Sequence, residues 1–427
     1  MQRQLLNALP RYFKIVSALL LLAVQLQGAT VLIPMDEDQN DHLKAYGITY
    51  WALAQGYTGD WLLNYRGGSF AFPDNQSLQL ECRIRGVDFE VVSTASYDNI
   101  LREIASPSVN AEKVKLEKAP KVAVYSPKSK KPWDDAVTLV LTYAEIPYDV
   151  LYDDEILDER LLLYDWLHLH HEDFTGQYGR FYASYRNQAW YKEEVAEMEA
   201  SAQKHGHGKV SQLKLAVVKK ISAFMAGGGY MFAMCSATDS YDIALAAQNT
   251  DICESMFDGD PMAPNAQSQL DFSKTLAFKD FNLRTNPMEY EYSDIDANFQ
   301  RQVPQGIDYF SLFNFSAKWD PIPTMLTQCH TRIVKGFMGQ TTAFRKSRLK
   351  SSVTILAEND AFGEARYIHG KFGLGMWSWY GGHDPEDYRH YVGDPVTELK
   401  NYPNSPGYRL ILNNVLFPAA EKKEQKT

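Results

Sequence analysis

The stretch VSQLKLAVVKKISAFMAGGGYMFAMCSATDS, residues 210–240, decides the fold class. Apolar residues from Leu213 to Phe224 recur at helical spacing, and the glycines at 227–229 end that pattern. The following YMFAM is a short, continuous apolar run of the kind found in a strand buried on both faces. We therefore expect a helix, a glycine turn and a buried strand that places Cys235 at its carboxyl end.

Strand and helix patterns alternate on both sides of this stretch. KVAVYS, YDVLYD and YDWLHLHH have the character of strands, and the helix pattern WDDAVTLVLTYAEI separates the first two. Farther along, SVTILAE and GKFGLGMWSWYGGHD return to regular structure, and SPGYRLILNNVLFPAA predicts a closing helix. Alternation of strands and helices favours a parallel sheet. We therefore predict an α/β protein with a doubly wound parallel sheet over residues 119–421.

The rest of the chain divides into smaller segments. Residues 30–118 predict a smaller N-terminal α/β domain, which ends in the Lys- and Glu-rich stretch NAEKVKLEKAPK, with the composition of a linker or a solvated edge. From about residue 254 to 350 the regular pattern weakens, and we expect a long insertion that covers one end of the sheet. Residues 422–427 form a charged tail.

Composition and the N-terminus limit the partners and the compartment. A net charge of -10 argues against nucleic-acid binding, because phosphate backbones require clustered Lys and Arg. Residues 1–29 combine basic residues, the apolar run IVSALLLLAV and small residues, so they predict a signal peptide and a periplasmic or secreted protein. No later run is long enough to span a membrane, and four cysteines are too few for a disulfide scaffold.

The cysteine at the end of the buried strand has two interpretations. Ala233 and Ala237 provide small residues two positions to either side, as a sharp strand-to-helix turn requires, and Asp239 or Ser240 can cap the next helix. A thiol at a helix N-terminus is favoured as the thiolate and can act as a nucleophile. The alternative is a buried structural cysteine, since free cysteines are often buried. Catalysis by Cys235 therefore requires a base.

One candidate base follows a strand near the end of the chain. His383, in YGGHDPEDY, comes after an apolar strand and two glycines, with Asp384 and Glu386 close enough to orient it. Together with Cys235, it would form a Cys-His pair with an acidic partner.

A second polar cluster comes from HLHHEDF, at the end of a strand that we expect beside the one carrying Cys235. His170, His171 and Glu172 could supply the base or hold a divalent metal, with His383 as a further ligand, or could form a polar strand end satisfied by backbone and solvent. Tyr178 and Arg180, in the aromatic run that follows, suit recognition of a carbohydrate or carboxylate, or else packing under a lid.

Over residues 121–420 the chain resembles the class I glutamine amidotransferase-like superfamily, and within it the trehalose-utilisation (ThuA-like) proteins. KVAVYS, LAVVKKISAFMAGGGYMFAMCSATD and GKFGLGMWSWYGGHDPEDY carry the likeness. It implies a flavodoxin-like sheet and a nucleophile, base and acid at Cys235, His383 and Glu386 or Asp384. ThuA-like members often lack that cysteine.

The departures from the resemblance are informative. Alanines replace the glycines that amidotransferases prefer around the nucleophile, and no synthase domain is evident. The chain also resembles sequences labelled asparagine synthetase B, but residue 2 is Gln where that enzyme needs cysteine, and the pyrophosphate loop S-G-G-x-D-S is absent. The motifs therefore do not support synthetase chemistry.

Two functions remain open from the sequence. The first is an exported cysteine-dependent hydrolase or acyl-transfer enzyme, a Cys-His amidohydrolase, acting on an amide or ester and needing no cofactor. The second is a ThuA-like carbohydrate-binding or carbohydrate-processing module, non-catalytic or dependent on a divalent metal. Both imply a small-molecule or carbohydrate ligand, and neither indicates an oligomeric state.

Overall fold

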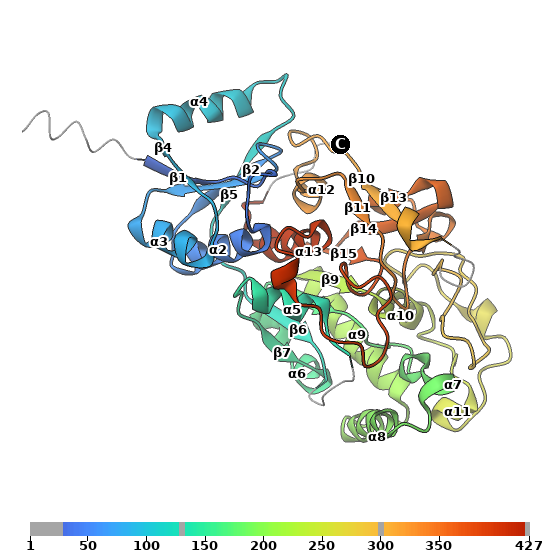
Figure 1. The fold of residues 1–427 in the computed structure, drawn as a ribbon. Helices are drawn as coiled ribbons and strands as arrows, with labels where there is room; N and C mark the ends of the chain where they lie inside the picture. The colour runs from blue at the N-terminus through green and yellow to red at the C-terminus, as the bar shows by residue number, and fades with distance from the viewer. Residues whose placement is uncertain (1–28, 128–132, 298–302, 423–427) are drawn as a thin grey trace, which may run out of the picture.

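The computed structural model describes residues 29–127, 133–297 and 303–422 and is a mixed α/β structure with two sheets (Figure 1). The stretch that decides the fold forms as predicted: α9 spans Val210–Ala226, β9 spans Tyr230–Met234, and Cys235 follows directly. Between them, Gly228 has a φ of 114°, which glycine adopts far more readily than other residues. The tight turn there brings α9 back against the sheet.

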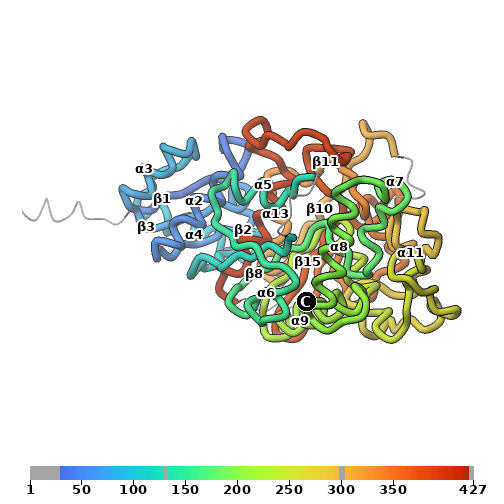
Figure 2. The backbone as a smooth tube through the Cα atoms, turned by 90° about the horizontal axis from the view of Figure 1, so that it is seen from below, coloured from blue at the N-terminus to red at the C-terminus, as the bar shows by residue number. Residues whose placement is uncertain are grey.

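The first sheet is wholly antiparallel, with strand order β4-β1-β3-β2-β5. Its strands are β1 (Ala29–Ile33), β2 (Gly59–Leu63), β3 (Ser69–Pro73), β4 (Glu90–Ser93) and β5 (Glu112–Leu116). Three helices accompany it: α2 (His42–Ala54), α3 (Gln76–Arg85) and α4 (Thr94–Ala105). This sheet lies at one end of the molecule in both views (Figures 1 and 2).

The second sheet has ten strands in the order β11-β10-β13-β14-β15-β9-β8-β6-β7, with β12 paired to β14. Its parallel half consists of β6 (Val122–Tyr125), β7 (Asp149–Leu151), β8 (Trp166–Leu169), β9 and β15 (Gly375–Tyr380). The other half is antiparallel: β10 (Tyr309–Leu312), β11 (Ile333–Lys335), β12 (Phe344–Arg345), β13 (Thr354–Asn359) and β14 (Glu364–Phe372). The expectation of a wholly parallel sheet was wrong for this half, because β14 and β15 form a hairpin.

Helices complete the second unit. They are α5 (Ala136–Tyr143), α6 (Asp153–Leu157), α7 (Tyr182–Tyr185), α8 (Ala189–Lys204), α9, α10 (Ser236–Ala246), α11 (Ser255–Asp258), α12 (Pro321–Leu326) and α13 (Pro406–Leu416). The closing helix α13 lies between the two sheets, packed against α2 and α5 (Figure 1). It is buried on nearly all sides, and one hydrophobic core therefore runs from the first sheet into the second.

Three further expectations concern the insertion, the cap of the helix after Cys235 and the domain boundary. The segment 254–350 contributes β10, β11 and β12 to the sheet and does not merely cover its end. The helix after Cys235 begins at Ser236, so Cys235 itself is the N-cap and Asp239 lies in the first turn; neither Asp239 nor Ser240 caps the helix. The boundary near residue 118 falls in the gap between β5 and β6, and independent folding of the two units stays a prediction.

Candidate functional site

Cys235 occupies a strained turn at the carboxyl edge of the parallel strands. Its φ is 50° and its ψ is -138°, a conformation that residues with a side chain rarely adopt. The alanines at 233 and 237 are fully buried on either side, and the backbone N–H of Ala237 donates to the carbonyl of His170 at 3.0 Å. The turn is thereby anchored to the end of β8, the neighbouring strand, as predicted.

Backbone N–H groups surround the sulfur. The N–H of Gln340 donates to Cys235 Sγ at 3.3 Å. Burial raises the pKa of this thiol to about 11, although the N–H groups of Thr341, Gln340 and Ser236 act in the opposite direction. The N–H of Ser236 at the helix N-terminus favours the thiolate, as expected from the sequence, but burial outweighs it and favours the neutral thiol.

The loop that carries these N–H groups is fixed from three directions. The Gln340 side chain donates to the carbonyls of Gly179 and Tyr290 at 2.8 and 2.9 Å. The Thr341 hydroxyl donates to Asp239 Oδ1, also at 2.9 Å. Burial raises the pKa of Asp239 to about 7. The donors that face Cys235 are thus held in place by groups from the insertion and from α10.

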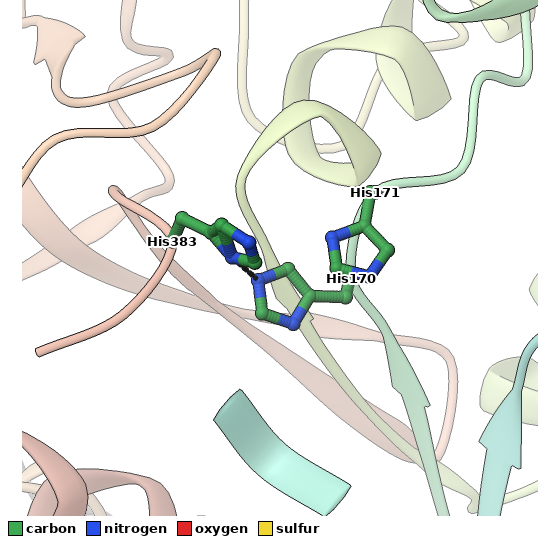
Figure 3. A group of neighbouring side chains, drawn as sticks. All are labelled: His170, His171 and His383. Carbon is green, nitrogen blue, oxygen red and sulfur yellow. Dashed lines mark hydrogen bonds between the residues drawn. The ribbon is translucent and has the colours of Figure 1, made fainter. Parts of the chain in front are cut away.

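Three histidines converge beside this turn (Figure 3). His170 and His171 follow β8, and His383 follows β15, so they come from strands on either side of β9. Nδ1 of His383 lies 2.9 Å from Nε2 of His170, and one ring nitrogen from each histidine lies within 4.8 Å of the others. Burial, followed by the neighbouring imidazoles, lowers the pKa of His383 well below its usual range. The lowered pKa favours the neutral imidazole and makes His383 a weaker base than a free histidine.

Asp135 stands behind this cluster and was not singled out in the sequence. It is the N-cap of α5, and its Oδ2 lies 3.2 Å from both His168 Nε2 and His170 Nδ1. Burial alone would raise the pKa of Asp135, but the two imidazoles hold it well below the usual range. A carboxylate next to Nδ1 favours the proton of His170 on that atom. Nε2 of His170 is then an acceptor for the Nδ1 proton of His383.

The predicted acidic partners of His383 have other roles in the structure. Asp384 accepts hydrogen bonds from the backbone of Glu386 and from Thr397, and Glu386 accepts one from Ser405. Their carboxylates accept hydrogen bonds from donors in and near the loop that follows His383, because this loop turns back on itself immediately after the strand. The carboxylate that the structure places in line with His383 is Asp135, through His170.

A further histidine also lies at this site without having been predicted. The ring of His390 lies 4.5 Å from that of His383, centroid to centroid. His390 bridges Asp134 and Asp387 at 3.0 and 2.9 Å. Burial would lower the pKa of His390, but these carboxylates raise it to about 9. His390 therefore carries a positive charge at pH 7.

One cavity of about 530 Å³ joins Cys235, His171 and His383. Its other lining residues include aromatic side chains from several segments: Trp133, Phe181, Tyr185, Tyr290 and Tyr391. Arg389 and Glu291 add charges of both signs. The cavity is thus large enough for a small-molecule ligand, with apolar walls and few charged groups.

The remaining predicted ligand-binding residues are placed differently. Arg180 lines the cavity, but its guanidinium donates to the carbonyls of Arg284, Asn286 and Glu289. Tyr178 packs in a hydrophobic cluster. The carboxylate of Glu172 accepts a hydrogen bond from the backbone N–H of His170 at 3.3 Å. These three side chains support the shape of the site more than they face a ligand.

Comparisons with known proteins identify no family. No family model and no curated protein matches the chain. Among solved structures, two proteins of Salmonella typhimurium described as cytoplasmic are similar at 11% and 10% identity, with TM-scores of 0.36 and 0.34; the matches cover 70% and 71% of this chain and all of theirs. A β-galactosidase from Bacillus circulans matches at 11% identity with a TM-score of 0.26, over 68% of this chain and 32% of its own. At these TM-scores the likenesses carry no functional argument.

The expectation of a periplasmic or secreted protein is corrected by this comparison, because both Salmonella structures are described as cytoplasmic proteins. We assign no compartment. Except for Ala29, which begins β1, the predicted signal peptide lies outside the described residues. Within the described ranges, no helix is long and apolar enough to cross a membrane.

Proposed function

We propose that the protein is a cysteine-dependent hydrolase or acyl-transfer enzyme that acts on an amide or ester carbonyl. The observation that carries the proposal is the position of Cys235: it sits at a strained turn with positive φ, and it lines the same cavity as His383. Backbone strain of this kind collects at functional sites, where the fold over-determines it.

The relay behind the base supports the proposal. Asp135 Oδ2 lies 3.2 Å from His170 Nδ1, and His170 Nε2 lies 2.9 Å from His383 Nδ1, so the three groups form a chain of contacts. With the proton of His383 on Nδ1, its Nε2 carries the lone pair that a general base needs. The raised pKa of the thiol and the lowered pKa of the imidazole both oppose a preformed ion pair, so the proposal requires the proton to move together with nucleophilic attack.

The reaction then proceeds through a thioester. Sγ of Cys235 bonds to the carbonyl carbon while its proton passes to His383 Nε2. The C–N or C–O bond breaks, and the leaving nitrogen or oxygen takes that proton. Water gives a proton to the same imidazole and attacks the thioester, which releases the carboxylic acid and returns the proton to the sulfur. The N–H groups of Ser236 and Gln340, which donate to the sulfur in the structure, would be the candidates to hold the oxyanion.

The strand order adds a proposal about the fold. The five parallel strands run β7-β6-β8-β9-β15, which in order of first appearance is the 2-1-3-4-5 order of flavodoxin-like sheets. We propose that this half is a flavodoxin-like sheet, related to the class I glutamine amidotransferase-like and ThuA-like proteins. In such sheets ligands bind beyond the carboxyl ends of the strands, where Cys235 and the histidines lie.

A carbohydrate ligand is the second candidate, and the aromatic walls of the cavity favour it. Trp133, Phe181, Tyr185 and Tyr290 offer ring faces, and such faces suit sugar rings as well as aromatic acyl groups. In this alternative, Cys235 would be a bystander, and a sugar would stabilise the protein without any covalent step.

Hydrolysis of activated substrates distinguishes these functions. We would assay p-nitrophenyl esters and p-nitroanilides of aromatic and aliphatic acids with the wild type, Cys235→Ala and His383→Ala. His205→Ala is the matched control, because His205 pairs with Asp154 away from the cavity. The proposal predicts hydrolysis that Cys235→Ala abolishes and His383→Ala slows by about 10²–10⁴-fold. Equal hydrolysis by all variants, or thermal stabilisation by sugars without any hydrolysis, would favour the binding module.

A further inference from the structure

We infer that His170, His171 and His383 form a binding site for one divalent first-row metal ion, with zinc as the best fit. The three imidazoles approach one another from two strand ends, and one ring nitrogen of each lies within 4.8 Å of the others (Figure 3). The set contains no atom of Cys235, but it shares His170 and His383 with the proposed covalent chemistry.

The distances suit a tetrahedral ion. Zinc binds imidazole nitrogen at about 2.0–2.1 Å, so two ligand nitrogens in a tetrahedral site lie about 3.3 Å apart. The pair formed by His383 Nδ1 and His170 Nε2 is 2.9 Å apart, and the third nitrogen lies within 4.8 Å of both. Because the nitrogens of that pair share a hydrogen bond, binding an ion requires the proton between them to leave and the rings to reorient.

The surroundings also have the character of a metal site. Metal-binding histidines usually direct their second ring nitrogen to a carboxylate, and His170 Nδ1 lies 3.2 Å from Asp135. His171 and His383 line the cavity of about 530 Å³, so a fourth coordination position faces a space that water or a ligand can enter. Three protein ligands and one open position form the arrangement of a reactive metal site.

A second cluster of potential metal ligands already contains a positively charged side chain. Asp251, Cys253 and Asp258 also bring potential ligand atoms together. There, however, the ammonium group of Lys209 pairs with both carboxylates and already supplies the positive charge. Among the described residues, no lysine or arginine ion pair occupies the histidine cluster in that way. His170 contacts His383 and Asp135, and the ring of His390 lies 4.5 Å from that of His383.

Metal binding has one consequence that rests on the proposed function. An ion shared with His170 takes the lone pair of His383 Nδ1, so the proton of His383 must move to Nε2. The general-base role needs the opposite tautomer. The metal-bound protein and the protein with the relay therefore exclude one another, and the metal would act as an inhibitor of the cysteine chemistry.

Cobalt titration tests the site without any substrate. The full-length protein, stripped with EDTA and dialysed, is titrated with Co²⁺ and followed by visible absorption, and Zn²⁺ is then added as a competitor. We expect one Co²⁺ per chain with the strong d–d bands of tetrahedral coordination, displaced by one Zn²⁺. The absence of saturable binding near one equivalent would overturn the inference.

Variants test the assignment of ligands. His171→Ala should abolish the tetrahedral spectrum, and Asp135→Asn should weaken affinity by about 10–100-fold. His205→Ala and Cys235→Ser should bind as the wild type does. Unchanged binding in His171→Ala, or loss of binding in Cys235→Ser, would overturn the three-histidine site. Circular dichroism establishes whether each variant is folded. If His171→Ala is unfolded, His383→Gln replaces it as the variant that lacks one ligand.

The two proposals fail separately. Acylation of Cys235 in the metal-free protein without any Co²⁺ binding would remove the metal site and leave the proposed function intact. Stoichiometric Co²⁺ binding in a protein whose Cys235 is never acylated would support the metal site and remove the proposed function.

Discussion

Nδ1 of His383 lies 2.9 Å from Nε2 of His170, although 213 positions separate the two residues in the sequence. The strands that precede them, β15 and β8, flank β9, which delivers Cys235 between them. Parallel strands meet at one edge of the sheet with their carboxyl ends, so this strand order alone gathers the thiol and both imidazoles. The third member of the relay, Asp135, joins from the N-terminus of α5.

The relay predicts that Asp135 contributes more to the rate of Cys235 acylation than its neighbour Asp134 does. Asp135→Asn should lower the rate of Cys235 acylation by about 10²-fold, because an amide no longer fixes the proton of His170 on Nδ1. Asp134→Asn is the matched control, since Asp134 pairs with His390 and not with His170. Stopped-flow kinetics with an activated ester measure both variants. A larger loss in Asp134→Asn than in Asp135→Asn would place the relay elsewhere.

Backbone strain at Cys235 predicts an unusual order of stability. Cys235→Gly should be more stable than Cys235→Ala by about 1–3 kcal/mol, because glycine adopts a φ of 50° without the strain of a side chain. Urea unfolding followed by tryptophan fluorescence gives the free energies.

Cys82 provides the control for that comparison. It is equally buried but lies inside helix α3, where glycine costs about 1 kcal/mol relative to alanine. The order of the two variants should therefore reverse at position 82. If glycine is the less stable variant at position 235 as well, the turn there is not strained.

The raised pKa of Cys235 predicts how its alkylation depends on pH. The rate with iodoacetamide should keep rising above pH 9 and reach its half-maximum near pH 11, because burial disfavours the thiolate. Peptide mass spectrometry separates this site from the other three cysteines, which are also free. A half-maximum below pH 8 would mean that a thiolate is preformed, in contrast to the proton transfer proposed here.

Burial of Asp239 predicts a pH-dependent stability. Its pKa is raised to about 7 in the folded protein and is near 3.8 when the residue is unperturbed, so the folded state binds the proton more tightly. The stability that this group contributes is present below about pH 4 and is lost as the pH rises to about 7, by on the order of 4 kcal/mol. Asp239→Asn should therefore increase the free energy of unfolding at pH 8 relative to the wild type.

Asp242, one turn later in α10, is the contrasting variant. Its carboxylate accepts hydrogen bonds from the backbone N–H groups of Leu276, Ala277 and Phe278. Asp242→Asn leaves at least one of these buried donors unpaired and should destabilise the protein at every pH. Chemical unfolding at pH 4.5 and pH 8 compares the two variants. Destabilisation by Asp239→Asn at pH 8 would contradict the assignment.

The sequence was sufficient for the local elements and for the pairing of two strands. The periodicity before Gly227 predicted α9, and the expectation that the strand ending in His170 lies beside that of Cys235 was confirmed by β8 and β9. Local patterns succeed here because each depends on burial within one short segment. The antiparallel half was missed although β14 and β15 are joined by only Gly373 and Leu374, a connection too short for a parallel crossover.

The partners of the site residues could not be predicted in the same way. The sequence around Asp135 is typical of a helix N-cap, and Asp135 does cap α5. Nothing in the neighbouring sequence indicates its contact with His170. The N–H of Gln340 reaches Cys235 from 105 positions away. Asp384 and Glu386 were expected to orient His383 because they are near it in sequence, but a loop's own backbone competes for nearby carboxylates.

The most direct test of the central claim is to trap the acyl group on Cys235. The metal-free protein is mixed with p-nitrophenyl acetate, quenched in acid within milliseconds to minutes, and digested for peptide mass spectrometry. The account predicts an acetyl thioester on Cys235 that forms about 10²–10⁴-fold more slowly in His383→Ala, with Cys82, Cys253 and Cys329 unmodified. Acetylation of Cys235 at the same rate in both proteins, or its absence from the wild type, would contradict the account.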